Sequence, residues 1–481
     1  MFKCENRINR IKKNITKLVK KKKYESALGM IMGLSAVLYN YNQWYKDNFL
    51  EEQLKLILEK LQNKQEILKQ DYKPKKNYIV YYDGMGFDTR GLTLIYLNAL
   101  CGLGYKVIYV TELSHKGNIS NIETIIKKNN GVIEYYKIHS IVKMASEISS
   151  IILKYSPQYS FIYTTPYDVH GILAFMNNES NTTRYMINQT DHAFWLGINA
   201  LDYCIEFRNY GAAISRDCRG VSKDRIFIQP FYPYVNETEE FEGYPFEKKE
   251  EDKVIFSGGA LYKTIDKSDT YYKLIAYILE QDKKVKFWYA GVGDATRLYK
   301  LRNHYPGRVF YTGERQDLYQ IFKHVDMYIN TYPMVGGLMM QYAAKAGIVP
   351  LTIRHDEDGE GFLFDQESIG VEFESLEDAK KHAIQYLNNN IDRKRIGIVI
   401  QNAIISKEDF KNNLKYILNK NKSMFEIKPK VVYTERLRIE YKERFEMREF
   451  YICFFNKYNL RGLIKYMPIA AIIAIVRSII K

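Results

Sequence analysis

The chain has 481 residues, too many for one ordinary hydrophobic core, so we expect two α/β domains of about 150 to 200 residues each, with helical ends. Hydrophobic residues make up 46% and charged residues 26% of the sequence, which excludes a wholly disordered chain and a protein with many membrane spans. The net charge of +15 suits an anionic partner. Because the positive residues gather largely at the two ends of the chain, we expect an anionic membrane surface and no nucleic acid.

The cysteines indicate a reducing compartment. Their number is odd, they are scattered, and they lack the spacing of metal ligands. They are Cys4, Cys101, Cys204, Cys218 and Cys453. The N-terminus has basic residues but no continuous apolar core followed by a small-residue cleavage site. We therefore expect no signal peptide and a cytoplasmic protein.

Residues 1–75 are expected to form a helical extension. This stretch is rich in Lys and Leu, its apolar residues recur close to the helical period, and two or three helices fit. Its basic residues form either a solvated helix face or a site for an anionic partner. They are Lys12, Lys13, Lys17, Lys20, Lys21, Lys22 and Lys23.

Residues 76–240 are expected to form a first Rossmann-like domain. From Tyr78 onward, short apolar runs alternate with amphipathic stretches, a pattern typical of βαβ units and a parallel sheet. The expected strands are Tyr78–Tyr82, Val107–Val110, Val132–Tyr136, Phe161–Tyr163 and Tyr185–Ile187. The expected helices are Gly91–Leu103, Ile119–Lys128 and Ile141–Tyr155.

Residues 241–425 repeat this pattern more cleanly and are expected to form a second such domain. The stretch Asn236–Asp252 is crowded with Glu and Lys and has almost no periodic apolar residues, so we interpret it as the linker. The expected strands are Val254–Phe256, Lys286–Ala290, Val309–Tyr311, Met327–Asn330, Val349–Ile353 and Val371–Phe373. The expected helices are Thr270–Leu279, Ala295–Asn303, Leu318–His324, Gly337–Ala346 and Leu376–Asn388.

Residues 426–481 are expected to add C-terminal helices. The apolar run Tyr466–Val476 is too short to cross a hydrocarbon core, which needs about 20 residues. Isoleucines flanked by basic residues suit a helix that lies in the membrane interface, on the inner face of the cell membrane. The flanking residues are Arg461, Lys465, Arg477 and Lys481. The alternative is a helix that packs on the protein's own core.

Loops that follow strands are the expected binding sites, because ligands of doubly wound sheets lie outside the carboxyl ends of the strands. Four such loops in the second domain carry Gly, which lets a phosphate or a base approach the backbone closely. They are Ser257–Gly259, Gly291–Asp294, Gly313–Arg315 and Thr331–Gly337. Gly336 and Gly337 open a helix whose N–H groups and positive dipole end form an anion site. The alternative is that each Gly serves only a tight turn.

Two basic residues beside these loops suit a diphosphate. Lys263 can supply a point charge and Arg315 a planar fork, unless either is simply solvated. The sequence has no GxxxxGK[ST] motif, and the first βα turn of each domain lacks GxGxxG, which disfavours a P-loop NTPase and an NAD dehydrogenase. No Asp-x-Asp motif follows a strand, so we expect no metal ion.

The segment Asn188–Gly197 concentrates polar groups after a strand of the first domain. Its Asp191 and His192 form a pair that can tune an imidazole for proton transfer, and we expect both to be catalytic unless His192 only caps a helix or packs. Acceptor contacts are expected from Gly86, Asp88, Arg90 and His170. Asp88 could instead cap the following helix, and His170 could be structural.

The second domain carries four motifs in order, from Val254 to about Asn388: SGGALYK, AGVGD, VFYTGERQDLYQIFKHVDMYINTYP and GGLMMQYAAKAGIVPLT. This order of motifs resembles the donor domain of GT-B-fold glycosyltransferases. The segment YYDGMGFDTRGLTLIYLNALCGLGYKVIYVTE similarly resembles their acceptor domain. The resemblance implies two Rossmann-like domains that face a cleft and a UDP-sugar donor, the only small molecule required. The donor-binding residues then expected are Gly258, Gly259, Lys263, Gly291, Gly313, Arg315, Tyr332, Gly336, Gly337, Gln341 and Tyr342.

The sequence departs from one pattern of this resemblance. In many retaining members two glutamates bracket the GGL-like turn, the second contacting the nucleotide ribose, and here these positions hold Met334 and Tyr342. This shifts the resemblance toward the O-GlcNAc transferases and the bacterial adhesin glucosyltransferases. Tyr342 or the adjacent Gln341 would then contact the ribose.

Three functions fit this architecture. The leading prediction is transfer of a hexose or N-acetylhexosamine from a UDP-sugar to a glycan, a lipid-linked precursor or a protein. A UDP-sugar 2-epimerase is the second, although the helical N-terminus and the basic, apolar C-terminus favour a large or membrane-borne acceptor. The third is a catalytically inactive GT-B protein that binds glycans or assists glycosylation, since both glutamates are missing.

Overall fold

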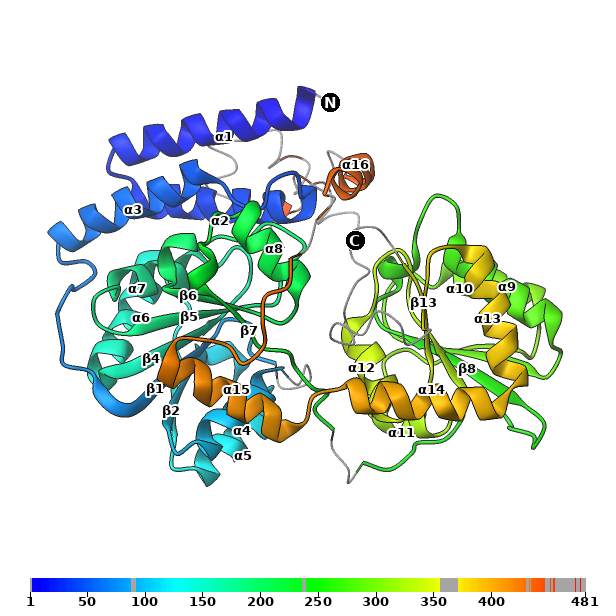
Figure 1. Ribbon diagram of the computed structural model, residues 1–481. Coiled ribbons are helices and arrows are strands. Elements are labelled where there is room, and N and C mark those ends of the chain that lie inside the picture. Colours follow the sequence, from blue (N-terminus) through cyan, green and yellow to red (C-terminus); the bar gives the residue numbers. More distant parts are fainter. Residues whose placement is uncertain are drawn as a thin grey trace. The chain divides into compact units, whose positions relative to one another are not determined.

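The computed structural model of the protein (Figure 1) describes residues 2–87, 92–235, 239–354 and 371–429, and beyond them 432, 434–445, 450, 453, 454, 472 and 476. The chain divides into two compact units. The first comprises Met1–Gln229 and Phe410–Lys481, and the second comprises Pro230–Asp409. Each unit is built on its own parallel sheet.

The sheet of the first unit has the strand order β3-β2-β1-β4-β5-β6-β7 among the described residues. The strands are β1 (Lys75–Asp83), β2 (Lys106–Glu112), β3 (Val132–Tyr136), β4 (Pro157–Tyr163), β5 (Thr183–Asn188), β6 (Tyr203–Glu206) and β7 (Ile226–Ile228). The helices are α4 (Leu92–Gly102), α5 (Ser120–Lys128), α6 (Ile141–Tyr155), α7 (Val169–Asn177) and α8 (Asn209–Asp217). The sequence does not predict β6 and β7, because these strands are short and β6 ends in a buried carboxylate, so neither gives a clear apolar run.

Aromatic residues fill much of this unit's core. Rings on neighbouring strands stack across the sheet, with centroids 6.4 Å apart for Tyr81 and Phe161 and 5.3 Å apart for Phe161 and Tyr185. Offset stacking adds to the free energy gained from burying such large apolar surfaces. The sequence has 42 tyrosines, and those in the first sheet therefore have a packing role.

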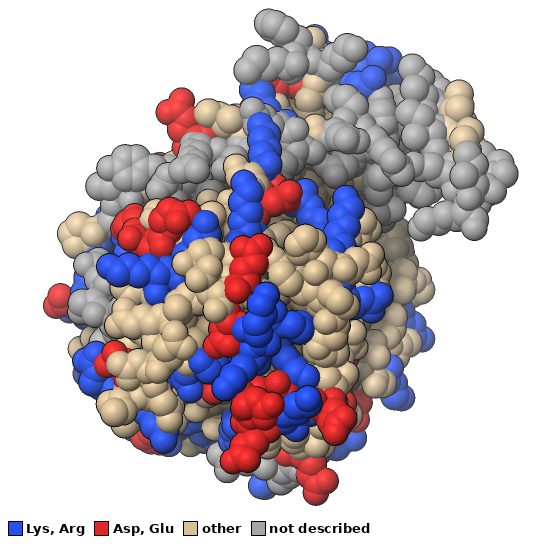
Figure 2. Space-filling model, turned by 90° about the vertical axis from the view of Figure 1, so that its right-hand side faces the viewer, with Lys and Arg blue, Asp and Glu red and all other residues tan. Residues whose placement is uncertain are grey.

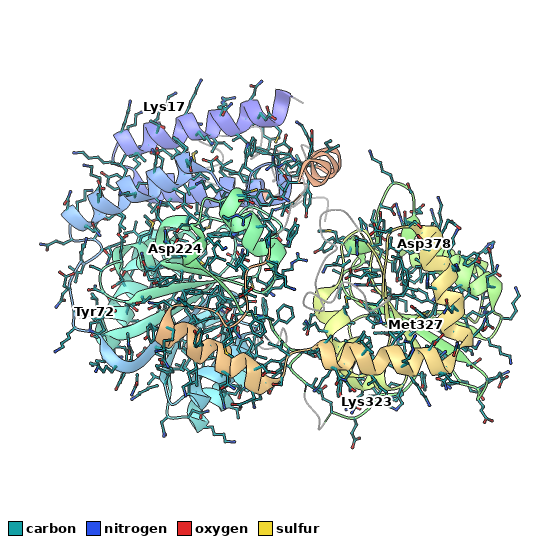
Figure 3. All side chains as sticks on the ribbon, in the orientation of Figure 1. Lys17, Tyr72, Asp224, Lys323, Met327 and Asp378 are labelled. Atoms are coloured by element: carbon teal, nitrogen blue, oxygen red, sulfur yellow. The ribbon has the colours of Figure 1, made fainter. Side chains whose placement is uncertain are left out.

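Helices α1 (Phe2–Lys20), α2 (Tyr24–Tyr41) and α3 (Asn48–Asn63) form the N-terminal extension. In α1, apolar residues recur every three or four positions and are buried, while the Lys and Arg residues between them are more exposed. Lys17, labelled in Figure 3, lies on this exposed face. Helix α2 is buried along almost its whole length because it packs against α1 and α3 and against α6 and α7.

The chain returns to the first unit after the second. Helix α15 (Lys407–Lys420) packs its Phe410 ring edge-on against Tyr96, with centroids 5.0 Å apart. The Asn413 side chain, which is fully buried, donates to the carbonyl oxygen of Ile228 at 2.9 Å. Helix α16 (Glu435–Arg444) also belongs to this unit. Residues 410–425, which the sequence assigned to the second domain, therefore lie in the first unit, because their contacts are with α4 and β7.

The sheet of the second unit has the order β10-β9-β8-β11-β12-β13 among the described residues. The strands are β8 (Lys253–Gly258), β9 (Val285–Ala290), β10 (Val309–Tyr311), β11 (Met327–Ile329), β12 (Pro350–Ile353) and β13 (Glu372–Phe373). The helices are α9 (Thr270–Gln281), α10 (Thr296–His304), α11 (Leu318–Lys323), α12 (Gly337–Lys345), α13 (Leu376–Asn388) and α14 (Asn390–Ala403). Each strand expected here is present, and the two parallel sheets confirm the predicted α/β class.

Charge and hydropathy of the described surface bear on the expected membrane contact. Lys and Arg side chains are interspersed with Asp and Glu on the face shown in Figure 2. None of the helices in the described residues is long and apolar enough to cross a membrane. The C-terminal run Leu460–Lys481, expected to lie in the membrane interface, falls outside the described residues except for Ile472 and Val476.

Candidate functional site

The four glycine-bearing loops of the second unit lie side by side, because they follow the adjacent strands β10, β9, β8 and β11. Backbone hydrogen bonds join three of them. The N–H of Gly291 donates to the carbonyl of Gly313 at 2.7 Å, and the N–H of Gly259 donates to the carbonyl of Ala290 at 3.0 Å. The structure thus brings together the predicted donor residues of the first three loops.

Glycine has two distinct uses in these loops. A Cβ on Gly291 would overlap the carbonyl oxygen of Gly259, so this position needs Gly for the loops to pack at all. Gly259 and Gly313 have φ angles of +119° and +68°, and a Cβ on either would meet no atom within 4 Å. The first use is structural, while the second leaves open space beside the backbone.

Asn330, directly after β11, organises the fourth loop and is not among the site residues that the sequence predicts. Its Oδ1 accepts hydrogen bonds from the N–H groups of Thr331 at 2.9 Å and Gly336 at 2.8 Å. Its Nδ2 donates to Thr352 Oγ1 at 3.2 Å. Met327, labelled in Figure 3, marks the other end of this strand. The signal in the sequence was an Asn directly after a strand and before a Gly-rich turn, where its side chain can bond to the backbone.

The hydrogen bonds of Asn330 reduce the number of N–H groups that the predicted anion site can offer at the start of α12. The N–H of Gly336 is engaged by Asn330, and the first helical hydrogen bond of α12 runs from Met340 N–H to the Gly336 carbonyl at 2.9 Å. The N–H groups of residues 337 to 339 therefore have no acceptor within the helix. Of the two glycines predicted for the anion site, Gly337 belongs to this set of N–H groups, whereas Gly336 serves as the helix N-cap.

Lys263 lies next to this turn. It belongs to the short 3-10 helix Leu261–Thr264, and its carbonyl oxygen accepts a hydrogen bond of 3.4 Å from Met334 N–H. Lys263 and Tyr332 are both half-buried. The loops after β8 and β11 are thus in contact, which brings the backbone of Lys263 to the turn that precedes α12.

Arg315 has structural partners inside the second unit. Its guanidinium makes two hydrogen bonds to Asp317, at 2.7 and 2.6 Å, and one to the carbonyl of Gly243 at 3.2 Å. Burial opposes the ionisation of Asp317, but this fork holds the pKa of its carboxyl below the ordinary range. The role of Arg315 toward a donor remains a prediction.

The two residues predicted to contact a ribose lie within α12. The hydroxyl of Tyr342 donates to the carbonyl of Tyr234 at 2.7 Å, and burial raises its pKa to about 12. Gln341 is 6% exposed. Their contact with a nucleotide also remains a prediction.

In the first unit, Asp191 and His192 come together after β5 as the sequence predicts. The distance between Asp191 Oδ1 and His192 Nδ1 is 3.5 Å. Arg208, just before α8, was not predicted, and it binds the same carboxylate through Nε at 2.5 Å and Nη2 at 3.1 Å. Burial opposes ionisation of Asp191, but the guanidinium holds its pKa well below the ordinary range. The imidazole of His192 is 28% exposed, so it lies beside a fixed negative charge and remains reachable.

His170 belongs to a separate polar cluster. Asp168 Oδ1 lies 3.2 Å from His170 Nδ1 and caps α7 by accepting the Gly171 N–H at 2.9 Å. Tyr82 donates to Asp168 Oδ2 at 2.6 Å, and the Tyr136 hydroxyl lies 3.1 Å from His170 Nε2. The ring is therefore hydrogen-bonded through Nε2, while the buried Nδ1 faces the Asp168 carboxylate without a hydrogen bond of good geometry, which fits a structural role as well as an acceptor contact.

The remaining predicted acceptor residues lie after β1. The buried Asp83 accepts hydrogen bonds from the N–H groups of Met85 at 2.8 Å and Gly86 at 2.9 Å. A Cβ on Gly86 would overlap the imidazole of His115. Asp88 and Arg90 lie outside the described residues. Gly86 thus has a packing reason of its own, and none of the contacts above tests an acceptor.

Metal ligands are not grouped in the described part of the chain, where no set of three or more His, Cys, Asp or Glu side chains could hold an ion. The expectation of a metal-independent site stays a prediction.

Comparisons with known proteins bear on the fold. No protein-family model and no curated protein sequence matches the chain. Among solved structures it is similar to a glycosyltransferase from Rickettsia africae, with a TM-score of 0.52 and 12% identity over 73% of this chain and 100% of that chain. It is also similar to a mutant of the O-GlcNAc transferase of Thermobaculum terrenum, with a TM-score of 0.53 and 12% identity over 90% of this chain and 81% of that chain. At this identity the likeness concerns the fold, and the GT-B resemblance seen in the sequence is confirmed at that level.

Proposed function

We propose that the protein is a glycosyltransferase that moves a hexose or N-acetylhexosamine from a UDP-sugar to a glycan, a lipid-linked precursor or a protein. One observation carries the proposal. Loops after four adjacent strands lie along one edge of the second sheet, and the two after β8 and β11 are in contact before the start of α12, where N–H groups lack helical partners. Backbone donors at a helix N-terminus, reached through glycine loops, are a physical basis for binding a nucleotide diphosphate.

The donor is proposed to bind with its diphosphate at the N–H groups of residues 337 to 339. Lys263, half-buried beside the turn, would add a positive charge. The open space beside Gly259 and Gly313 leaves room for other parts of the donor close to the backbone. Because backbone dipoles and one cation meet the diphosphate charge, we propose that no metal ion is required.

The transfer step is proposed to use His192 as the proton acceptor. The acceptor hydroxyl oxygen forms a bond to C1 of the sugar, the bond between C1 and the UDP oxygen breaks, UDP leaves, and the hydroxyl proton passes to the imidazole. Asp191, held ionised by Arg208, would orient and stabilise the protonated ring. Gly86, Asp88, Arg90 and His170 remain proposed acceptor contacts.

Location is part of the proposal. We propose that the protein works in the cytoplasm and reaches an anionic membrane surface through Leu460–Lys481, where a lipid-linked acceptor would be available.

The experiment that tests the function is incubation of the purified full chain with UDP-glucose, UDP-galactose, UDP-N-acetylglucosamine and UDP-N-acetylgalactosamine. Release of UDP, by slow hydrolysis or by transfer to added cell-envelope material, is the expected result. Conversion of one free UDP-sugar into another would instead identify an epimerase. UDP binding without turnover would identify an inactive glycan-binding or glycosylation-assisting protein.

A further inference from the structure

The loop that carries His192 is bonded to the N-terminal helical extension at two places. Asn42, which follows α2, donates from Nδ2 to the carbonyl oxygen of His192 at 3.0 Å. Glu51 of α3 accepts through Oε1 from the N–H groups of Gly197 at 2.7 Å and Ile198 at 3.2 Å. The chain between the candidate catalytic residue and the 3-10 helix Ile198–Ala200 is therefore fixed at both ends by α2 and α3.

Burying the carboxyl of Glu51 costs free energy that a purely structural helix would not need to spend. Glu51 is 4% exposed, and burial raises the pKa of its carboxyl even though hydrogen bonds from the backbone of residues 197 to 199 oppose this effect. The side chain of Asn199 also donates, from Nδ2 to Oε2 at 3.2 Å. An apolar residue would pack at this position without desolvating a charge, as Leu50, Leu54 and Ile57 do elsewhere on the buried face of α3. What the carboxyl provides is acceptors for the backbone of this loop.

The extension also contacts Arg219, which in turn donates hydrogen bonds to the loop that carries His192. This fully buried side chain donates from Nη2 to the carbonyl oxygens of Thr190 at 2.9 Å, Asp191 at 3.0 Å and Ala193 at 2.7 Å. The ring of Tyr45, in the connection between α2 and α3, lies 5.4 Å from its guanidinium carbon. Together with Asn42, these bonds give every carbonyl from residue 190 to residue 193 a side-chain donor.

We infer that the N-terminal extension positions the transfer site, with Asn42 and Glu51 as positioning residues for His192. The backbone on each side of His192 is fixed, while its imidazole stays 28% exposed. A rigid backbone that presents a reachable side chain is the arrangement that a proton-transfer group needs, because small displacements from the productive geometry lower the rate sharply. The inference rests on the proposed function and gives the extension a role beyond any contact with a membrane.

The test compares four variants of the full chain: Asn42→Ala, Glu51→Leu, Glu51→Gln and, as the matched control, Glu52→Gln. Glu52 is the exposed neighbour of Glu51 on the same helix. We expect Glu51→Leu and Asn42→Ala to lower kcat by about 10-fold to 100-fold, with the Kd for UDP unchanged, since the donor loops belong to the other unit. Glu51→Gln keeps an oxygen that can accept from Gly197 and Ile198, so it should retain most of kcat. Glu52→Gln should match the parent.

A second readout does not depend on activity. Amide hydrogen exchange of the peptide that contains residues 190 to 199 should be faster in Glu51→Leu than in Glu52→Gln, because two amides lose their acceptor. Parental kcat in folded Asn42→Ala and Glu51→Leu would overturn the inference. If Glu51→Leu fails to fold, parental kcat in Asn42→Ala overturns it alone. If the parent itself turns over no UDP-sugar, the proposed function fails, and unchanged exchange in folded Asn42→Ala and Glu51→Leu would then overturn the positioning role as well.

Discussion

The loops at the carboxyl ends of the strands are held in place by different kinds of hydrogen bond in the two sheets. In the first unit, loops after the strands are held by buried side chains, such as Asp83 after β1 and Arg208 and Arg219 around Asp191. In the second unit, backbone hydrogen bonds join three of the loops, as between Gly291 and Gly313, and one side chain, that of Asn330, organises the fourth. Side-chain bonding fixes the geometry of a reacting group, whereas bare backbone gives a ligand close access. The first edge is therefore suited to positioning and the second to binding.

Three buried carboxyl groups of the first unit differ in the direction of their pKa shifts. Burial raises the pKa of Asp83 and Glu206, whose hydrogen-bond donors are neutral, and for Glu206 it outweighs the attraction of Arg219. The pKa of Asp191 is lowered although its carboxyl is also buried, because Arg208 binds it directly. Asp191, the carboxylate beside His192, is thus the one of these three that the structure keeps charged most firmly.

The largest expected effect concerns the buried ion pair of the first edge. Arg208→Leu leaves Asp191 buried without its cation and should lower the free energy of unfolding by about 3 to 5 kcal/mol, measured by chemical denaturation. The matched control is Arg216→Leu in α8, whose pairing with Asp217 is at the surface and should contribute less than about 1 kcal/mol. Equal losses in the two variants would remove the distinction between buried and exposed pairing.

The next effect concerns the reacting group. His192→Ala should lower kcat by about 10²-fold or more, with the Kd for UDP unchanged, because general-base catalysis contributes on this scale. Steady-state kinetics combined with calorimetric UDP titration measures both quantities. Turnover at the parental rate would return His192 to a structural role.

The next prediction concerns the proposed diphosphate site at the second sheet, which an added side chain should obstruct. Gly337→Asp places a like charge where we propose that the diphosphate binds, and it should weaken UDP binding by about 10-fold or more while the unit stays folded. Gly307→Asp is the control for added charge, since this glycine lies before β10, at the opposite end of the strands, and a Cβ there meets no atom within 4 Å. Because its φ of +71° strains any side chain at this position, both variants are first shown to be folded by circular dichroism. Calorimetry that gave the two variants the same Kd would place the phosphate site elsewhere.

A smaller effect concerns pH. Because the native pKa of Glu206 is raised above its ordinary value of 4.5, the native state holds this proton more tightly than the unfolded state. The stability contributed is therefore complete below pH 4.5 and is lost as the pH rises through the native pKa, by about 1.4 kcal/mol for each pH unit that separates the native from the unfolded pKa. Glu206→Gln removes this loss, so the free energy of unfolding of the variant should rise relative to the parent between acid and neutral pH. A constant difference across that range would contradict the raised pKa.

The smallest effect is the one expected from a chelator. If backbone N–H groups and Lys263 meet the diphosphate charge, EDTA should leave the rate of UDP release unchanged. Loss of activity that Mn²⁺ restores would show that the site needs a metal ion.

The two units also differ in how much of each could be predicted from the sequence. The second unit was predicted strand by strand because glycines mark the carboxyl ends of several of its strands, a local signal. In the first unit the sequence indicated Asp191 and His192, which are adjacent, but not the residues that hold them. Asn42 and His192 are 150 positions apart, and Glu51 and Gly197 are 146 apart. Contacts at such separations leave no periodic pattern. Strand β6 escaped prediction for a different reason, because it is short and its apolar run ends in the buried carboxylate of Glu206.

The central claim, that the glycine-bearing edge of the second sheet binds the nucleotide of a sugar donor, is tested most directly by hydrogen exchange with and without saturating UDP. We predict slower amide exchange in peptides that cover residues 257–264, 290–294 and 331–339, and loss of this protection in Gly337→Asp. Protection confined to peptides of the first unit, or no protection at a concentration where calorimetry shows binding, would contradict it.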